Sequence, residues 1–190
     1  MKEAVMNENL IRKTKLFWPW QDQEEEAWLE EMSRQGLHLL QAQTLGRYVF
    51  EKGAPKAYAY RLDYQDSLKD EQHYLKIFED SGWQRVAAQG GWHYFRQEIQ
   101  QGKVPEIFSD SDTKIKKYER VKTLLVSMLP LYVLVLVLNA SQPDGELWGL
   151  RWWLQACGSV VSIPFFGTAI VLSVIAWFKL DKRIQELRGM

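Results

Sequence analysis

Aromatic side chains recur at alternate positions in two segments that favour β-strands. Trp92, Tyr94 and Arg96 alternate in one segment, and Tyr58 and Tyr60 alternate in the other. Because side chains two residues apart share one face of a sheet, these five residues predict an exposed aromatic face that binds a small amphipathic or aromatic molecule. The alternative is that the rings belong to the core, since a slip of one residue exchanges the two faces.

Other residue types that often carry chemistry lack the spacing for it. His38, His73 and His93 have no companions at metal-ligand spacing. The pair Gly90-Gly91 suits a hairpin turn better than a phosphate-binding loop. The run Glu24–Glu26 is expected to be the solvated first turn of a helix, where carboxylates interact favourably with the helix dipole. We therefore expect no catalytic residue, no metal and no cofactor, and we interpret the chain as a non-enzyme; an enzyme acting on lipids is the alternative.

Two later stretches are almost pure hydrocarbon. Residues 123–140 and 152–178 contain no Asp, Glu, Lys or Arg. A helix needs roughly 20 apolar residues to cross the hydrocarbon core of a bilayer, so the two stretches predict two transmembrane helices with the lipid bilayer as partner. The formal net charge of zero argues against nucleic acid as a partner, because nucleic-acid modules usually carry a basic surplus.

The positions of the cations predict how the two helices cross the membrane. The connecting segment 141–151 has Arg151 as its single cation. The flanking segments are richer in cations, which are Lys114, Lys116, Lys117, Arg120 and Lys122 before the first stretch and Lys179, Lys182, Arg183 and Arg188 after the second. Cations collect on the cytoplasmic side of a membrane. We therefore expect a two-pass protein of the cell (plasma) membrane with both termini in the cytoplasm.

Small residues recur four apart in the second apolar stretch. They are Gly158 and Ser162, and again Ala169 and Ser173. Small residues at this spacing let two helices approach closely. They are expected to pack the hairpin against itself, and packing against a second copy or another membrane protein is the alternative.

The part before the apolar stretches contains an internal repeat. Trp28 and Gly36 in one copy correspond to Tyr74 and Gly82, which lie 46 residues later in the other, and such self-similarity indicates duplicated structural units. Each copy predicts a strand, a helix and a β-hairpin. We expect an α+β domain in which repeats 12–53 and 57–98 form one antiparallel sheet, with both helices on one face.

Local signals give further detail within each repeat. Asp22 is expected to cap the first helix, which ends near Gln35, and Ser67 or Asp70 begins the second helix. The equivalent residues Phe50 and Phe95 are expected beneath the helices. The complete organisation is a cytoplasmic α+β domain over 12–104, a stalk helix over 105–122, transmembrane helices over 123–140 and 152–178, an external loop over 141–151 between them, and a basic tail over 179–190.

Several stretches of this sequence resemble a known bacterial family. "KLFWPWQDQEEEAWLEEMSRQGLHL", "GGWHYFR" and "IFSDSDTKI" are similar to the domain of unknown function DUF2812, over roughly Thr14 to Val121. The resemblance implies a membrane-linked sensing or regulatory role and gives no catalytic residues to carry over. The doubled strand-helix-strand-strand order also resembles gyrase-inhibitor-like sensing domains, which bind flat apolar molecules between their halves; fold alone does not settle function.

These observations favour a regulatory or sensing protein anchored in the membrane. Its cytoplasmic module is expected to bind a small amphipathic ligand or a protein partner. The alternative is an accessory interaction subunit of a membrane complex, which packs through its transmembrane hairpin on another membrane protein or as a homo-oligomer.

Overall fold

The structure is a computed structural model that describes residues 9–65, 70–100, 105–106, 111–140 and 150–189. Within these ranges, the side chains of residues 111–113, 139–140 and 150–158 lie outside the description. The chain divides into two units, the first ending at Arg120 and the second beginning at Val121. Ser67, one of the two residues expected to begin the second helix, and most of the external loop expected at 141–151 fall outside the described residues.

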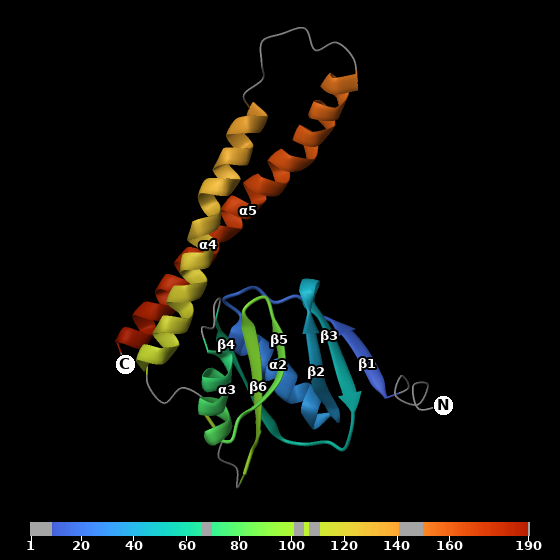
Figure 1. Cartoon of the computed structure of the whole chain (residues 1–190), viewed down its shortest axis with the longest axis vertical. Coiled ribbons are helices and arrows are strands. Elements are labelled where there is room, and N and C mark those ends of the chain that lie inside the picture. Colours follow the sequence, from blue (N-terminus) through green and yellow to red (C-terminus); the bar gives the residue numbers. More distant parts are fainter. Residues whose placement is uncertain (1–8, 66–69, 101–104, 107–110, 141–149, 190) are drawn as a thin grey trace. The chain divides into compact units, whose positions relative to one another are not determined.

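The same order of elements occurs twice in the first unit (Figure 1). The first set is β1 (Leu10–Thr14), α2 (Asp22–Arg34), β2 (Leu37–Gln43), the short 3₁₀ turn η1 (Thr44–Gly46) and β3 (Arg47–Lys52). The second set is β4 (Tyr58–Tyr64), α3 (Glu71–Asp80), β5 (Gln84–Gln89) and β6 (Trp92–Glu98). The predicted order of strand, helix, strand and strand is present in both.

Details of the backbone also agree between the two sets. Gly36 and Gly82 follow α2 and α3 with φ angles of 77° and 84°, a left-handed conformation that glycine adopts without strain. The hairpin β2–β3 is irregular after Leu39, and the hairpin β5–β6 is irregular after Arg85, the residue 46 positions later. Asp70 caps α3 by accepting a hydrogen bond from the His73 amide at 2.9 Å.

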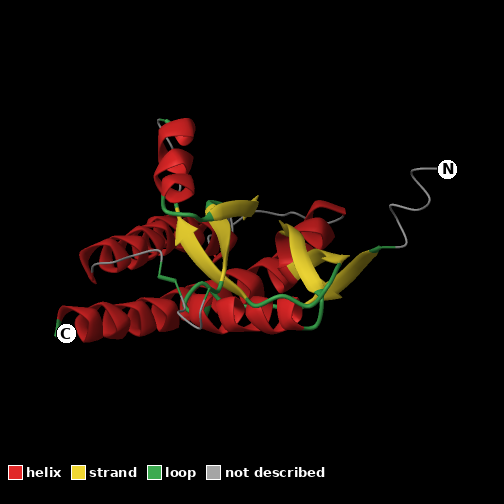
Figure 2. Ribbon diagram, turned by 90° about the horizontal axis from the view of Figure 1, so that it is seen from below, coloured by secondary structure: helices red, strands yellow, loops and turns green. Residues whose placement is uncertain are grey.

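The strands form two separate sheets, which corrects the prediction of one sheet. Each sheet is antiparallel and has three strands, in the orders β1-β3-β2 and β4-β6-β5. Figure 2 shows them as two distinct groups of strands. In each sheet the last strand of the set lies in the centre, so the two sheets have equivalent topologies.

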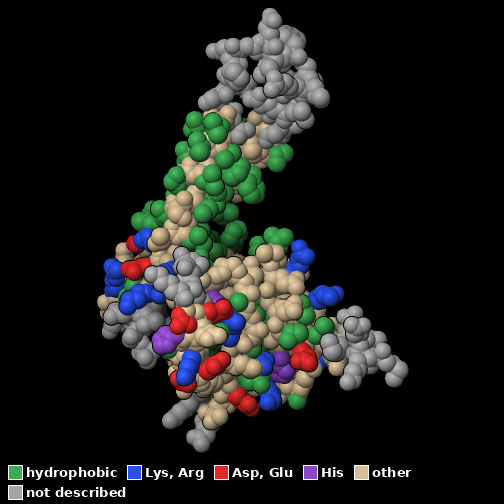
Figure 3. All heavy atoms as spheres, viewed as in Figure 1, with side chains coloured by type: hydrophobic (Ala, Val, Ile, Leu, Met, Phe, Trp, Pro, Cys, Tyr) green, Lys and Arg blue, Asp and Glu red, His purple; other side chains and the backbone are tan. Residues whose placement is uncertain are grey.

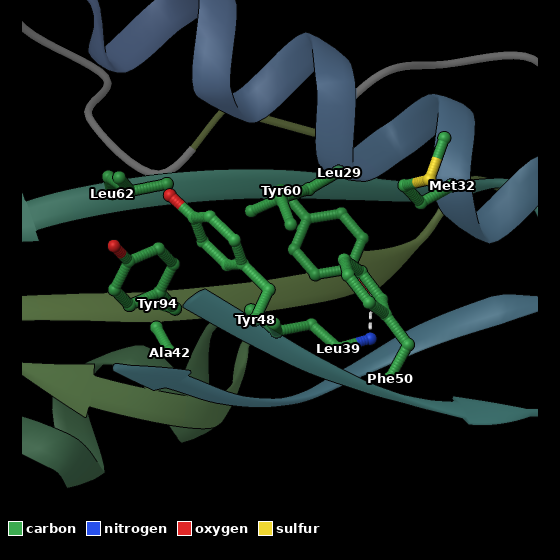
Figure 4. Packing of buried hydrophobic residues seen from close by; sticks show 9 residues of the cluster. All are labelled: Leu29, Met32, Leu39, Ala42, Tyr48, Phe50, Tyr60, Leu62 and Tyr94. Carbon is green, nitrogen blue, oxygen red and sulfur yellow. Dashed lines mark hydrogen bonds between the residues drawn. The ribbon is translucent and has the colours of Figure 1, made fainter. Parts of the chain in front are cut away.

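Helix α2 packs against strands of both sheets, namely β2 and β4. Its residues Leu29 and Met32 share a core with Phe50 of the first sheet and with Tyr60 and Tyr94 of the second (Figure 4). The core therefore lies between α2 and the two sheets. The expected position of Phe50 beneath a helix is confirmed.

Helix α3 lies on the other face of the second sheet. Phe78 of α3 packs on Phe95 of β6, with ring centroids 4.3 Å apart, and the same cluster contains Ala59 and Trp83. Since Tyr94 faces α2 and its neighbour Phe95 faces α3, the two helices cover opposite faces of this sheet. The prediction that both helices share one face is therefore wrong, although Phe95 does lie beneath a helix as expected.

Two long apolar helices follow, α4 (Ser111–Ala140) and α5 (Leu150–Arg188). By length and composition both are sufficient to cross a membrane. They pack together in the second unit, where Lys122 pairs with Asp181 at 2.5 Å and lies over the Trp177 ring. Hydrophobic side chains cover much of the described part of both helices on the face shown in Figure 3.

Candidate ligand site between the two halves

A cavity of about 160 Å³ lies in the first unit where the two sets of elements meet. Its walls come from the loop between β1 and α2, from α2, from η1 and from strands of both sheets. The lining residues are Leu16, Phe17, Trp18, Pro19, Asp22, Glu25, Gln43, Leu45, Gly46, Tyr48, Leu62, Gln89, Trp92 and Tyr94. Five of these fourteen residues are aromatic, so part of the wall suits a flat ring.

One carboxylate of α2 stands in this aromatic wall. Glu25 is buried, and its Oε1 accepts hydrogen bonds from Tyr48 at 2.7 Å and Tyr94 at 2.8 Å. Within the described part of the chain these bonds involve Oε1 and not Oε2. Burial raises the pKa of Glu25 above its usual value, while the two tyrosine hydrogen bonds oppose that rise. A buried carboxylate among aromatic rings is a favourable neighbour for a cation.

A second carboxylate of the cavity wall is already paired. Asp22 accepts a hydrogen bond from Lys117 at 2.6 Å and one from the Tyr118 hydroxyl at 3.1 Å. Lys117 also donates to the carbonyl of Leu62 at 3.2 Å, and Asp22, Lys117 and Tyr118 are all buried. Asp22 therefore joins α2 to the first turns of α4. This corrects the expectation that its side chain caps α2, because the helix is preceded by Gln21 and has no side-chain cap.

The third buried acidic residue of α2, Glu26, faces the second sheet. Its Oε1 accepts a hydrogen bond from the Leu62 amide at 2.8 Å, and Arg61 lies 3.9 Å from its Oε2. Burial raises the pKa of Glu26 to about 7, against the nearby charge of Lys117, which lowers it. Glu25 and Glu26 are thus buried and only Glu24 is exposed. The expectation of a solvated acidic turn is wrong for two of its three residues.

A larger hollow of about 280 Å³ lies beside this network, and its wall is charged rather than aromatic. Arg61 lines it and pairs with Glu30 at 3.1 Å and with Glu106 at 3.3 Å. Lys114 pairs with Glu106 as well, at 3.5 Å. The charged side chains of this hollow therefore form ion pairs with one another. Among the described residues, no group of three His, Cys, Asp or Glu side chains is arranged to hold a metal ion.

Comparison with models of known protein families gives a match for this chain. A model described as "Protein of unknown function (DUF2812)" matches residues 21–129, more than half of the sequence. The chain belongs to the DUF2812 family. This confirms the resemblance seen in the sequence. No curated protein and no solved structure matches the chain.

The DUF2812 match covers α2 with its buried residues Asp22, Glu25 and Glu26, both sheets except β1, and α4 as far as Leu129. The matched residues therefore include Glu25, Tyr48, Trp92 and Tyr94 of the cavity. The loop that carries Phe17 and Trp18 precedes residue 21 and lies outside the match. The family description names no activity, so the role of the cavity has to be argued from its own residues.

The structure places the five predicted ligand residues in three surroundings. Trp92 and Tyr94 line the aromatic cavity of this DUF2812 chain. Tyr60 is fully buried in the core, where its hydroxyl contacts Ser33 at 3.0 Å. Tyr58 and Arg96 lie together at the edge of this core and are half-buried, with the guanidinium 4.9 Å from the Tyr58 ring centroid and the Tyr58 and Tyr60 rings 6.5 Å apart. The structure therefore brings two of the five residues together in the cavity.

Sequence reasoning missed the residues that complete the cavity. The sequence predicts a solvated position for Glu25 and gives no signal that Phe17 and Trp18 belong to a site. One signal was present: Asp22, Glu25 and Leu29 recur at helical spacing, so the buried stripe of α2 passes through the acidic residues.

The small residues expected to pack helices lie in α5. Ser173 is buried, while Ser162 and Ala169 are half-buried. The burial of Gly158 lies outside the description. Close to Ser173 along the helix, Ala176 and Leu180 are also buried, so this stretch of α5 is covered by residues of the chain itself.

Proposed function

We propose that this protein is a non-enzymatic sensor anchored in the plasma membrane, and that its α+β unit binds a small amphipathic cation in the aromatic cavity. The observation that carries the proposal is Glu25, a buried carboxylate held by two tyrosine hydroxyls within a wall of aromatic rings. A flat cation gains from the rings through stacking and cation–π contact, and from the carboxylate through its charge.

The membrane part of the proposal rests on α4 and α5. Apolar side chains such as Leu138, Val160 and Phe165 are more than half exposed, which is unfavourable in water and suits acyl chains. The cations that flank both helices favour an orientation with both termini in the cytoplasm. The α+β unit would then lie in the cytoplasm as well.

The buried pair of Asp22 and Lys117 supports a sensing role. Asp22 lines the aromatic cavity one turn before Glu25, and it holds the first turns of α4. The same helix continues into the apolar segment. A cation in the cavity would compete with Lys117 for the acidic side chains of α2, so binding would alter how firmly the beginning of α4 is held.

The exposed apolar faces of α4 and α5 suit a partner helix as well as lipid. The role as an accessory interaction subunit therefore stays a prediction from the sequence. No described contact favours it over insertion in the bilayer.

The proposal is tested with the full chain in lipid nanodiscs and two flat fluorescent dyes small enough for the cavity, the cation N-methylquinolinium and the anion 2-naphthoate. Fluorescence anisotropy is measured after subtraction of the signal from empty nanodiscs. We expect saturable binding of the cation alone. Glu25→Gln should weaken it roughly tenfold to a hundredfold, the usual effect of losing one interaction with a charged group.

Two further variants sharpen the dye experiment. Trp92→Ala should weaken binding as well, because it removes one aromatic wall. Glu79→Gln, which neutralises an exposed carboxylate on α3, should leave the affinity unchanged. Equal binding of the two dyes, or an unchanged affinity in Glu25→Gln, would refute the proposal.

A further inference from the structure

Three apolar side chains stand in solvent at one end of the first sheet. The exposed fractions are 73% for Leu45, 61% for Leu16 and 39% for Trp18. The two segments that carry them are in contact, because the Lys15 amide donates to the Gly46 carbonyl at 2.8 Å. We call Leu16, Trp18 and Leu45 the apolar tip. Exposed apolar groups that cluster in this way usually mark an interaction surface.

The backbone holds Leu45 outward in an unusual conformation. Its φ and ψ are 62° and 33°, in the left-handed region that bulky residues rarely adopt. The next residue, Gly46, also has positive φ, and a Cβ there would collide with the Lys15 carbonyl and lie 3.0 Å from the Leu16 Cα. A strained residue that exposes its side chain indicates a use other than packing.

The surroundings of the tip are aromatic and cationic. Trp18 stacks on Trp20 with ring centroids 5.5 Å apart, and indole rings favour the interface between membrane and water. Lys15 and Arg47 flank the tip and are exposed. The tip segments "KTKLFWPW" and "QTLGR" contain no Asp or Glu, so the local charge is complementary to anionic lipid headgroups.

We propose that the apolar tip inserts into the headgroup region of an anionic lipid surface, and that the aromatic cavity takes its ligand from that surface. All three residues of the tip also line the cavity. The tip is therefore the rim of the cavity, and a molecule that dissolves in the bilayer reaches Glu25 past Leu16 and Leu45. The ligand class is then a cationic amphiphile that partitions into membranes. The ligand part rests on the proposed function, whereas the lipid contact does not.

The lipid contact is tested by spin labelling of the full chain in nanodiscs. Cys157, the single cysteine, is replaced by serine, and a nitroxide is attached at Leu45→Cys or, as a matched control, at Ile77→Cys. Ile77 is an apolar residue on α3 that is 53% exposed. Collision rates with oxygen, which concentrates in lipid, and with a water-soluble nickel chelate report the surroundings of each label.

In nanodiscs of mixed phosphatidylcholine and phosphatidylglycerol, we expect the ratio of oxygen to nickel collisions to rise severalfold at position 45 over position 77. Nanodiscs of phosphatidylcholine alone should reduce the rise, and Lys15→Glu with Arg47→Glu should remove it. A water-like ratio at position 45 in both lipids overturns the proposal. So does low access to both reagents regardless of lipid, which indicates a protein partner or a second copy.

The two proposals fail in different ways. If the cationic dye does not bind while the label at position 45 lies in lipid, the ligand site is wrong and the lipid contact stands. If the dye binds while the label stays in water, the lipid contact is wrong. If the chain does not enter nanodiscs at all, the proposed membrane anchor is wrong. The proposed contact of the apolar tip with the bilayer that holds this anchor is then wrong as well.

Discussion

Replacing Lys117 by methionine should loosen α2 and the beginning of α4 together. Lys117 is buried, pairs with Asp22 at 2.6 Å and donates to the Leu62 carbonyl at 3.2 Å. Methionine fills a similar volume without charge, so Asp22 would remain buried without its cation. Removing one partner of a buried ion pair destabilises a protein by about 3–5 kcal/mol.

The neighbouring Lys116 provides the matched control. It lies on the same turn of α4 and is exposed, so Lys116→Met should change the stability by no more than about 0.5 kcal/mol. A second variant, Asp22→Asn together with Lys117→Met, removes both charges and should regain part of the lost stability.

The assay is hydrogen exchange measured by mass spectrometry on the full chain in nanodiscs. Every 1.4 kcal/mol is a factor of ten in an equilibrium constant, so amides of α2 should exchange about two to four orders of magnitude faster in Lys117→Met. The difference should be smaller at about pH 5 than at about pH 8, because Glu26, with a pKa of about 7, is then protonated and needs the cation less. Equal exchange in Lys117→Met and Lys116→Met would refute the structural role of the pair.

Three further predictions concern titratable groups. Cation binding should strengthen as pH rises through the raised pKa of Glu25, because the ionised carboxylate attracts the ligand, and dye titrations across pH should lose this dependence in Glu25→Gln. Glu26→Gln should stabilise the α+β unit by on the order of 2 kcal/mol at about pH 8 and by little at about pH 4. The reason is that the folded pKa of Glu26 is raised to about 7, so the native protein loses stability as pH rises from the unfolded pKa of this group through 7. Denaturation followed by tryptophan fluorescence measures the difference. Burial lowers the pKa of His93, and its buried Nδ1 has no hydrogen-bond partner among the described residues. The native state should therefore lose stability as pH falls below the unfolded pKa of His93, and His93→Phe should remove this acid sensitivity in the same assay.

The repeated order of elements was predictable because its signals are local. The glycines at positions 36 and 82 end the two helices at corresponding places. In both hairpins, apolar and polar side chains alternate around a turn that contains glycine. Asp70, one of the two residues expected to begin the second helix, caps α3, and such a cap depends on the next three residues alone. The apolar stretches were equally clear, since their length and composition are enough to indicate helices that suit a bilayer.

The arrangement of the two sheets was not predictable from alternation. Both faces of β4 are covered, so that Ala59 and Tyr60, which point in opposite directions, are each fully buried. A strand buried on both sides carries no sequence signal for which helix covers which face. The prediction of both helices on one face rested on the equivalence of Phe50 and Phe95, and each of these does lie beneath the helix of its own repeat.

The cavity was only partly predictable because charged residues are usually assigned to the surface. Glu25 and Glu26 follow the helical spacing of the core, but their charge argued for solvent. Their burial depends on tyrosines and a lysine that are distant in sequence, Tyr94 and Lys117 among them. Such partners can be found only once the fold brings them together.

The most direct test of the account is to locate a bound ligand. A photoreactive derivative of a flat cationic dye is bound to the full chain in nanodiscs, irradiated and mapped by mass spectrometry. We expect labelling of peptides that contain Trp18, Tyr48 and Trp92, and loss of this labelling in Glu25→Gln. Labelling confined to α4 and α5, or labelling of the cavity that persists in Glu25→Gln, would contradict it.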